Sequence, residues 1–263
     1  MAIKPRVFVT VRDTKRPQRA KSPYIDNCFE SMGVMGSVYI NSQIPSSSGL
    51  GSSAAVTVAT LSAINDEFRM NKSREYIANM AFEIEKKVQK GRASPTDTTV
   101  SAYGGIVLIS GGSRRRLPPQ NMHLVIGDSL VSHSTARMVE QVAELRKNHP
   151  AIVEPVLDAI EGVSMSAIHH LSDPRELGRY MNMNNSLLEV LGVGHPQLAK
   201  MVLAARNAGA FGAKITGAGG GGCMVALCPK PLKHRVAGAI EACEARAIVT
   251  GIDTEGVRKE KNV

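Results

Sequence analysis

The alternation of apolar and polar residues predicts strands and helices in turn along the first third of the chain. Valine occupies every second position from residue 7 to residue 11, which is the two-residue period of a strand. A short helix over residues 23–32 and a second strand over residues 34–42 follow. Apolar residues then recur at helical spacing from Ala54 to Phe68, and again from Ile77 to Val88. Each series is one apolar stripe, so we predict a helix after residue 53 and another over about residues 73–89.

The rest of the chain predicts a mixed fold. Residues 94–97 begin a short helix, and apolar strands follow over residues 106–110 and near residues 122–127. Helices dominate from Ser134 onward. A glycine-rich run with a strand, a last helix and a short strand then close the chain. Strands come first and helices later, so the sequence predicts an α+β fold of two lobes, over residues 1–125 and 126–263.

Composition places the chain among ordinary globular proteins. Its 263 residues are 43% hydrophobic and 21% charged, which is enough apolar material for a substantial core. The four cysteines form no C-x-x-C pair, so the sequence predicts no zinc site. There is no signal-peptide pattern and no apolar run of about twenty residues, so we expect no membrane partner and a cytoplasmic location.

The net charge narrows the choice of partner. A formal charge of +9 favours an anion, either a phosphorylated small molecule or a nucleic acid. Tryptophan is absent and aromatic residues make up 4% of the chain, which argues against a base-stacking surface. The three arginines at residues 114–116 follow a pair of glycines and predict a solvated hairpin turn. We therefore expect no nucleic-acid partner.

A stretch rich in serine and glycine, PSSSGLGSSAA, precedes the first long helix. Its residues are Pro45, Ser46, Ser47, Ser48, Gly49, Leu50, Gly51, Ser52, Ser53, Ala54 and Ala55. The first N–H groups of a helix lack intrahelical partners and carry partial positive charge, and glycine lets a ligand approach the backbone. These properties favour an anion site, with phosphate as the usual occupant. A serine-capped helix after a flexible turn is the alternative.

A second glycine-rich loop occupies residues 216–222. Gly217, Gly219 and Gly222 match G-x-G-x-x-G, but a dinucleotide-binding loop opens a helix. Here residues 223–227 are continuously apolar and predict a buried strand instead. Five glycines in six residues exceed what a bend requires, so we expect a close approach to a ligand or to another backbone segment.

Two acids between the loops are candidates for chemistry. Glu85 falls at the edge of an apolar helix stripe, where it is either a solvated carboxylate or a Mg²⁺ ligand. Asp97 is the last residue of Ser-Pro-Thr-Asp, a pattern that predicts a capping box with Ser94 at the N-cap. The functional alternative for Asp97 is a general base that accepts or orients the proton of a hydroxyl nucleophile.

The order of these features resembles the GHMP kinase superfamily and, within it, the archaeal-type mevalonate kinases. The resemblance covers nearly the whole chain and is strong at both glycine loops. The choice of mevalonate kinase rests mainly on Ala93-Ser94-Pro95-Thr96-Asp97 and on Ser134-Thr135 before the next helix. It implies a ribosomal S5 domain 2-like first lobe with a left-handed β-α-β crossover, and a ferredoxin-like second lobe. The implied activity is Mg-ATP-dependent phosphorylation of the primary hydroxyl of mevalonate to 5-phosphomevalonate, in isoprenoid biosynthesis.

The resemblance also implies roles for individual residues. The PSSSGLGSSAA stretch would cradle the ATP phosphates, Ser53 and Glu85 would bind Mg²⁺, and Asp97 would be catalytic. The residues implied to contact substrate and phosphate are Thr135, Gly217, Ala218, Gly219 and Gly220. A homodimer is the family expectation.

One departure from the family pattern keeps other interpretations open. The family begins with a motif of the form P-G-K-x-x-L-x-G-E-H, and residues 1–40 contain no match. The expected explanations are a mis-assigned start, a shortened chain or an impaired relative. The alternatives for function are another small-molecule GHMP kinase, of the homoserine, shikimate or phosphomevalonate type, and a catalytically silent nucleotide-binding or regulatory protein.

Overall fold

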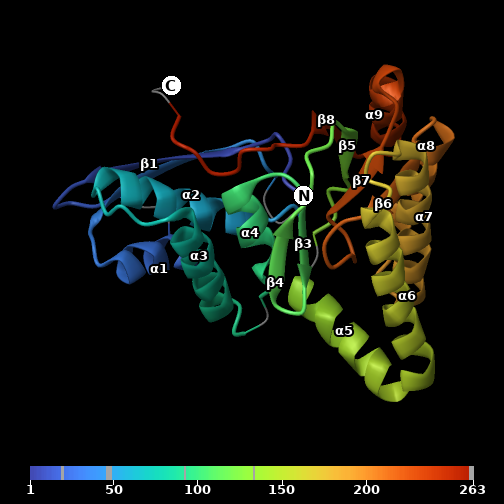
Figure 1. The fold of residues 1–263 in the computed structure, drawn as a ribbon, viewed down its shortest axis with the longest axis horizontal. Helices are drawn as coiled ribbons and strands as arrows, with labels where there is room; N and C mark the ends of the chain where they lie inside the picture. The colour runs from blue at the N-terminus through green and yellow to red at the C-terminus, as the bar shows by residue number, and fades with distance from the viewer. Residues whose placement is uncertain (19–20, 46–48, 92, 133, 261–263) are drawn as a thin grey trace. The chain divides into compact units, whose positions relative to one another are not determined.

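The computed structural model of the protein describes residues 1–18, 21–45, 49–91, 93–132 and 134–260 (Figure 1). Its contacts group into two units. Unit 1 comprises Met1–Ser46, Gly51–Pro119 and Ile252–Val263, and unit 2 comprises Ser47–Leu50 and Gln120–Gly251. The division into lobes at residue 125 stays a prediction.

Unit 1 opens on the predicted strand, helix and strand. Strands β1 (Val7–Asp13) and β2 (Gly36–Ser42) pair antiparallel, with Val9 opposite Ile40. Helix α1 (Pro23–Met32) joins them, and Pro23 suits its first position because that residue's missing N–H group has no intrahelical partner to lose. Gly33 ends the helix with φ of +66°, a left-handed conformation that costs glycine little. All three predicted elements are confirmed.

Three further helices complete the core of unit 1. They are α2 (Ser52–Glu67), α3 (Arg74–Val88) and α4 (Pro95–Tyr103). The predicted apolar stripes lie in one buried cluster with residues of α1, and its members from α2 and α3 include Val58, Leu61, Ile64, Ile77, Ala81 and Ile84. Ser73 caps α3 by accepting a hydrogen bond from the amide of Tyr76 at 3.1 Å, which fixes where that helix begins.

A small hairpin follows α4 in unit 1. Strand β3 (Val107–Ser110) pairs antiparallel with β4 (Ser113–Arg116). The prediction that residues 114–116 form the turn is wrong, because the two glycines at 111 and 112 make the turn and the arginines lie in β4. They are exposed there, and Arg114 donates to the side chain of Asn79 at 2.8 Å.

Unit 2 is built on one antiparallel sheet. Its strands are β5 (His123–Asp128), β6 (Gly212–Ile215), β7 (Cys223–Leu227) and β8 (Arg246–Gly251), in the order β6-β7-β5-β8. Helices separate β5 from β6 and β7 from β8, whereas β6 and β7 follow each other directly. This β-α-β-β-α-β order confirms the ferredoxin-like fold. The short strand β6 was not separated from β7 in the sequence prediction.

The helices of unit 2 provide the other half of its core. They are α5 (Thr135–Asn148), α6 (Pro150–Ile168), α7 (Pro174–Val190), α8 (Pro196–Asn207), the short 3-10 helix η1 (Lys230–Leu232) and α9 (Lys233–Glu241). Helices α8 and α9 pack on the sheet, and α7 packs against β6 (Figure 1). Side chains from both helices and strands form one buried cluster, including Leu198, Met201, Ala213, Met224 and Ile240. Among the described residues, no helix has both the length and the apolar character needed to cross a membrane.

Candidate active site

The first glycine loop leads into an uncapped helix end. Gly51 occupies the N-cap of α2 with φ of +69°, and no side chain in the described ranges caps the helix. The first intrahelical hydrogen bond runs from the amide of Ala55 to the carbonyl of Gly51 at 2.9 Å. The amides of the first turn are therefore left for a ligand or solvent. The alternative of a serine-capped helix is wrong, because a glycine stands at the cap.

The rest of the loop is described only in part. Ser46, Ser47 and Ser48 lie outside the described residues. Pro45, Gly49 and Leu50 have no regular secondary structure, and Ala54 is fully buried within α2.

Glu85 is a buried carboxylate rather than a solvated one. Only 3% of Glu85 on α3 is exposed, and the hydroxyl of Ser53 donates to its Oε1 at 2.6 Å. Burial raises the pKa of Glu85, the hydrogen bond from Ser53 opposes that shift, and the negative charge of Asp97 adds to it. The interpretation as a solvated surface residue is therefore wrong. A buried carboxylate that repels a second one is suited to a cation.

Asp97 lies in the first turn of α4, two residues after Pro95, and is exposed. Ser94 caps the helix as predicted, with its hydroxyl accepting from the amide of Thr96 at 3.3 Å. The reciprocal bond of a capping box is not found in the described part of the chain, where the Asp97 carboxylate accepts no hydrogen bond. Although Asp97 is exposed, the surrounding protein partly desolvates its carboxylate, and this desolvation raises the pKa of Asp97. The amino group of Met1 opposes that shift.

The helix end and the acid are in direct contact. A β-carbon placed on Gly51 would lie 3.1 Å from Cγ of Asp97 and 3.3 Å from its Oδ2. Unit 1 therefore brings together Gly51, Ser53, Glu85 and Asp97, which the sequence spreads over 47 positions. No group of three His, Cys, Asp or Glu side chains gathers anywhere in the described ranges. Mg²⁺ does not need such a cage, because it takes one or two carboxylates together with phosphate oxygens and waters. The residues present fit that ion.

The second glycine loop meets the first within unit 2. A β-carbon on Gly217, where φ is +64°, would lie 3.3 Å from the carbonyl oxygen of Gly49. Gly217 is exposed and Ala218 is partly exposed, so their backbone remains accessible to a ligand. Gly219 is buried, and a side chain there would collide with the carbonyl of Val193. The predicted close approach to another backbone segment is therefore confirmed.

Thr135 lies on the first turn of α5. The hydroxyl of Ser134 caps this helix by accepting from the amide of Arg137 at 3.3 Å, and Thr135 is exposed. One turn later, Met138 blocks the space beside Gly220, since a β-carbon on that glycine would collide with its sulfur. The first turn of α5 and the second glycine loop are thus neighbours within unit 2.

Two polar residues of unit 2 were missed in the sequence. The Lys214 ammonium donates to the carbonyl of Ile215 at 2.8 Å, and burial lowers the pKa of Lys214 to about 8. Asn185 of α7 is only 1% exposed and binds the amide of Ile215. The sequence did contain a signal for Asn185: Asn182 and Asn185 are three positions apart in a helical pattern, and residues at that spacing lie on one face of a helix. Two asparagines on one face indicate a shared polar partner.

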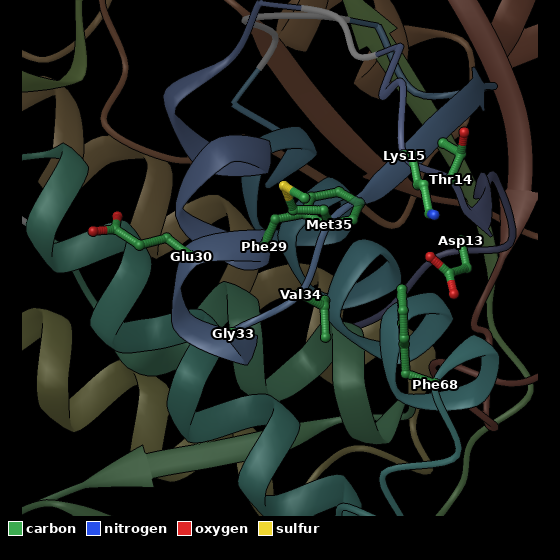
Figure 2. A pocket seen from close by; sticks show the side chains of 9 residues that line it. All are labelled: Asp13, Thr14, Lys15, Phe29, Glu30, Gly33, Val34, Met35 and Phe68. Atoms are coloured by element: carbon green, nitrogen blue, oxygen red, sulfur yellow. The ribbon is translucent and has the colours of Figure 1, made fainter.

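A hollow of unit 1 lies away from these residues. Its volume is about 430 Å³. Figure 2 shows the apolar side chains of Phe29, Val34 and Met35 on one side and Asp13 and Lys15 on the other. Phe68, which also lines it, follows the last residue of α2. Sixteen residues of helix separate it from Ser52, which is roughly 24 Å at 1.5 Å per residue. The hollow is therefore separate from the cluster around Asp97.

Comparisons with known proteins cover both units. Residues 21–105 match the profile of the GHMP kinases N terminal domain, and residues 164–245 match that of the GHMP kinases C terminal domain. The chain is 41% identical to a mevalonate kinase of Pyrococcus abyssi over 232 residues, which are 86% of this chain and 69% of that protein. It is 39% identical to the mevalonate kinase of Methanothermobacter thermautotrophicus over 225 residues, which are 82% and 73% of the two chains.

Solved structures show the same fold. A mevalonate kinase of L. major in complex with R-mevalonate superposes with a TM-score of 0.84 at 23% identity, covering 96% of this chain and 87% of that one. The mevalonate kinase of Methanococcus jannaschii gives a TM-score of 0.82 at 23% identity, with 96% and 90% covered. Sequence identity and fold agree, and the chain belongs to the GHMP kinase family, where its relatives include archaeal mevalonate kinases.

Proposed function

We propose that the protein is a mevalonate kinase, which transfers the γ-phosphoryl group of ATP to the primary hydroxyl of mevalonate and releases ADP and 5-phosphomevalonate. Relatives about 40% identical over most of the chain carry that name. The observation that carries the proposal is the contact between Gly51 and Asp97, which places an acid against an open helix N-terminus.

The helix end is the proposed phosphate site. The amides of the first turn of α2 point out of the helix with the positive end of its dipole behind them, and no side chain in the described ranges caps them. Phosphate groups bind such ends. We assign the ATP phosphates to the loop that contains Gly49, Leu50 and Gly51.

Mg²⁺ is the proposed cofactor. Ser53 and Glu85 are already hydrogen-bonded to each other at 2.6 Å, so their oxygens converge on one place beside the helix end. When bound, the ion neutralises charge on the phosphate oxygens. Its binding would also relieve the repulsion from Asp97, which adds to burial in raising the pKa of Glu85.

Asp97 is the proposed catalytic base. As the substrate oxygen forms its bond to the γ-phosphorus, the bond from that phosphorus to the bridging oxygen of ADP breaks. Asp97 accepts the hydroxyl proton. Its raised pKa brings the carboxylate closer to the strength that proton transfer near neutral pH favours. Most of the catalysis is positioning, as phosphoryl transfer requires.

The second glycine loop is the proposed substrate and phosphate loop. Gly217 and Ala218 offer accessible backbone, and Gly219 and Gly220 hold the loop in place by packing. Thr135 is proposed to approach the substrate from the neighbouring first turn of α5. The family resemblance also supports three further proposals: an ATP-binding lobe over residues 1–125, a homodimer and a cytoplasmic location.

The decisive test is ADP release that depends on mevalonate. The purified protein is assayed with ATP and Mg²⁺ against mevalonate, homoserine, shikimate and phosphomevalonate. We expect turnover with mevalonate. Turnover with another acceptor alone would move the assignment within the family, and ATP binding without turnover would favour the silent nucleotide-binding alternative.

The role of Asp97 has its own variant. Asp97→Asn is expected to lower kcat by about 10²–10⁴-fold, the range for loss of a general base, while ATP still binds. Asp26→Asn is the matched control, because Asp26 is also an exposed first-turn aspartate of a helix in unit 1. Substantial turnover by Asp97→Asn would remove Asp97 as an obligatory base.

A further inference from the structure

Strand β6, which leads into the second glycine loop, is an edge strand whose outer side is covered by side chains of α7. Edge strands present a row of unpaired N–H groups. On β6 two of these groups are satisfied by asparagines of α7: Oδ1 of Asn182 accepts from the amide of Ala213 at 3.0 Å, and Oδ1 of Asn185 accepts from the amide of Ile215 at 3.0 Å. The two asparagines are three positions apart, so they lie on the same face of the helix.

A glycine on the same face brings the helix close enough for these bonds. A β-carbon on Gly178, one turn before Asn182, would collide with the backbone of Phe211, and one on Gly212 would collide with the backbone of Gly178. Helix and strand therefore meet backbone to backbone. Asparagine, with a single methylene before its amide, is short enough to bridge elements at that spacing.

Ile215 is the last residue of β6 before the loop, and both of its peptide groups are held by side chains. Asn185 binds its N–H group, and the Lys214 ammonium donates to its carbonyl at 2.8 Å. Asn185 is itself fixed, because it is buried and its Nδ2 donates to Oε1 of Glu189 at 2.8 Å. Ile215 is therefore held on its outer side by Asn185, and the next residue, Thr216, is held on the other side by the carbonyl of Cys223, which accepts from its amide at 2.9 Å.

The turn after α7 holds the far part of the same loop. The amide of Gly220 donates to the carbonyl of Val193 at 2.9 Å, three residues beyond the end of α7. Between the two attachments lie Gly217 and Ala218, the more accessible part of the loop. One helix and its C-terminal turn thus hold the loop at both sides of its accessible segment.

We propose that Asn185 is a positioning residue for the substrate and phosphate loop, acting through its hydrogen bonds to Ile215 and Glu189. It does not touch the ligand. It fixes the root of residues 216–222 so that the backbone of Gly217 and Ala218 is presented in one orientation. The proposed consequence for catalysis rests on the proposed function of this loop, whereas the effect on the loop itself does not.

The principal variant is Asn185→Leu, which keeps the volume and leaves the buried amide of Ile215 unpaired. The matched control is Asn182→Leu, which removes the same kind of bond from the same strand two residues farther from the loop. Hydrogen exchange is measured on peptides that cover residues 216–222. We expect exchange about tenfold faster in Asn185→Leu, which corresponds to 1.4 kcal/mol of local opening, and less than twofold faster in Asn182→Leu.

Kinetics separate positioning from general destabilisation. In Asn185→Leu we expect KM for the acceptor to rise about tenfold with kcat within threefold of wild type, while Asn182→Leu keeps both values. If the wild-type protein shows no turnover, the proposed function fails, and hydrogen exchange still decides the role of Asn185. Equal exchange in the loop of both leucine variants would overturn the inference.

A charge-preserving swap covers the case in which Asn185→Leu does not fold. Asn185→Asp alone places a second carboxylate beside Glu189 and loses the donor between them. The double variant Asn185→Asp with Glu189→Gln exchanges donor and acceptor, so that both hydrogen bonds form again. We expect wild-type loop exchange and KM in the double variant and impaired values in Asn185→Asp. A double variant as impaired as the single one would contradict the inference.

Discussion

Lys214 is predicted to destabilise the folded protein at neutral pH, and the effect is measurable as a pH-dependent free energy. Burial lowers the pKa of Lys214 from 10.5 to about 8. The unfolded chain therefore binds more protons than the folded one between those values, and stability rises with pH there. Each pKa unit is worth 1.36 kcal/mol, so the whole shift is about 3 kcal/mol, of which about 2.5 kcal/mol is recovered between pH 7 and pH 10.

The comparison with Lys214→Met isolates this contribution. Other groups that titrate in the same range affect both proteins and cancel in the difference between their free energies of unfolding, which urea denaturation gives at each pH. We expect the free energy of unfolding of Lys214→Met to be higher than that of wild type at pH 7, and this difference to shrink by about 2.5 kcal/mol by pH 10. Loss of the hydrogen bond from Lys214 to Ile215 adds a constant to this difference at every pH, because a neutral amine also donates a hydrogen bond. A difference that stays constant from pH 7 to pH 10 would refute the reasoning.

Two further predictions concern the cluster around Asp97. Gly51→Ala is expected to lose about 1–2 kcal/mol of stability, because φ is +69°, and also to lose activity, because the new methyl group presses on Asp97. Gly33→Ala is the control: it has the same backbone strain, at φ of +66°, but its new methyl group meets no atom within 4 Å. It should therefore lose as much stability as Gly51→Ala and keep the kcat of wild type. Equal kcat values in the two alanine variants would show that Gly51 is not part of the active site. Mg²⁺ affinity, measured by calorimetry with a non-hydrolysable ATP analogue, is expected to fall up to tenfold per pH unit as the pH drops through the raised pKa of Glu85. Glu85→Gln should flatten this dependence, and an unchanged slope in that variant would exclude Glu85 as the titrating ligand.

Local patterns were sufficient for most secondary structure. The helix over Pro23–Met32 and the helices with apolar stripes begin and end within one or two residues of the prediction, because caps, prolines and periodicity act over short distances. The turn at the three arginines was misplaced because arginine is compatible with an exposed strand as well as with a turn. Strand β6 was missed because its four residues, Gly212–Ile215, are too few for a period of two to be visible.

The candidate site was predictable as a set of residues but not as an arrangement. Resemblance to a family supplied Ser53, Glu85 and Asp97, whereas local rules favoured ordinary roles for each. The contact of Gly51 with Asp97 joins α2 to α4, and no periodicity reports a tertiary contact. Asn185 was not predicted from the sequence for a related reason. The spacing of Asn182 and Asn185 indicates one shared helix face, but the partner of Asn185 is Ile215, 30 positions away in the chain, so only the packing of α7 against β6 shows what that face binds.

The places where local expectation fails are informative because they coincide. Serine in an extended conformation is typical of helix N-caps, yet the N-cap of α2 is Gly51 in a left-handed conformation, with Ser52 directly after it. Glutamate favours solvent, yet Glu85 is buried. An aspartate at the third helical position favours a capping bond, yet Asp97 makes none in the described part of the chain. Unrelated exceptions would be scattered over unit 1, but Gly51 contacts Asp97, and the charge of Asp97 adds to burial in raising the pKa of Glu85. Three departures from local stability that meet at one place are best explained by a ligand that all three serve.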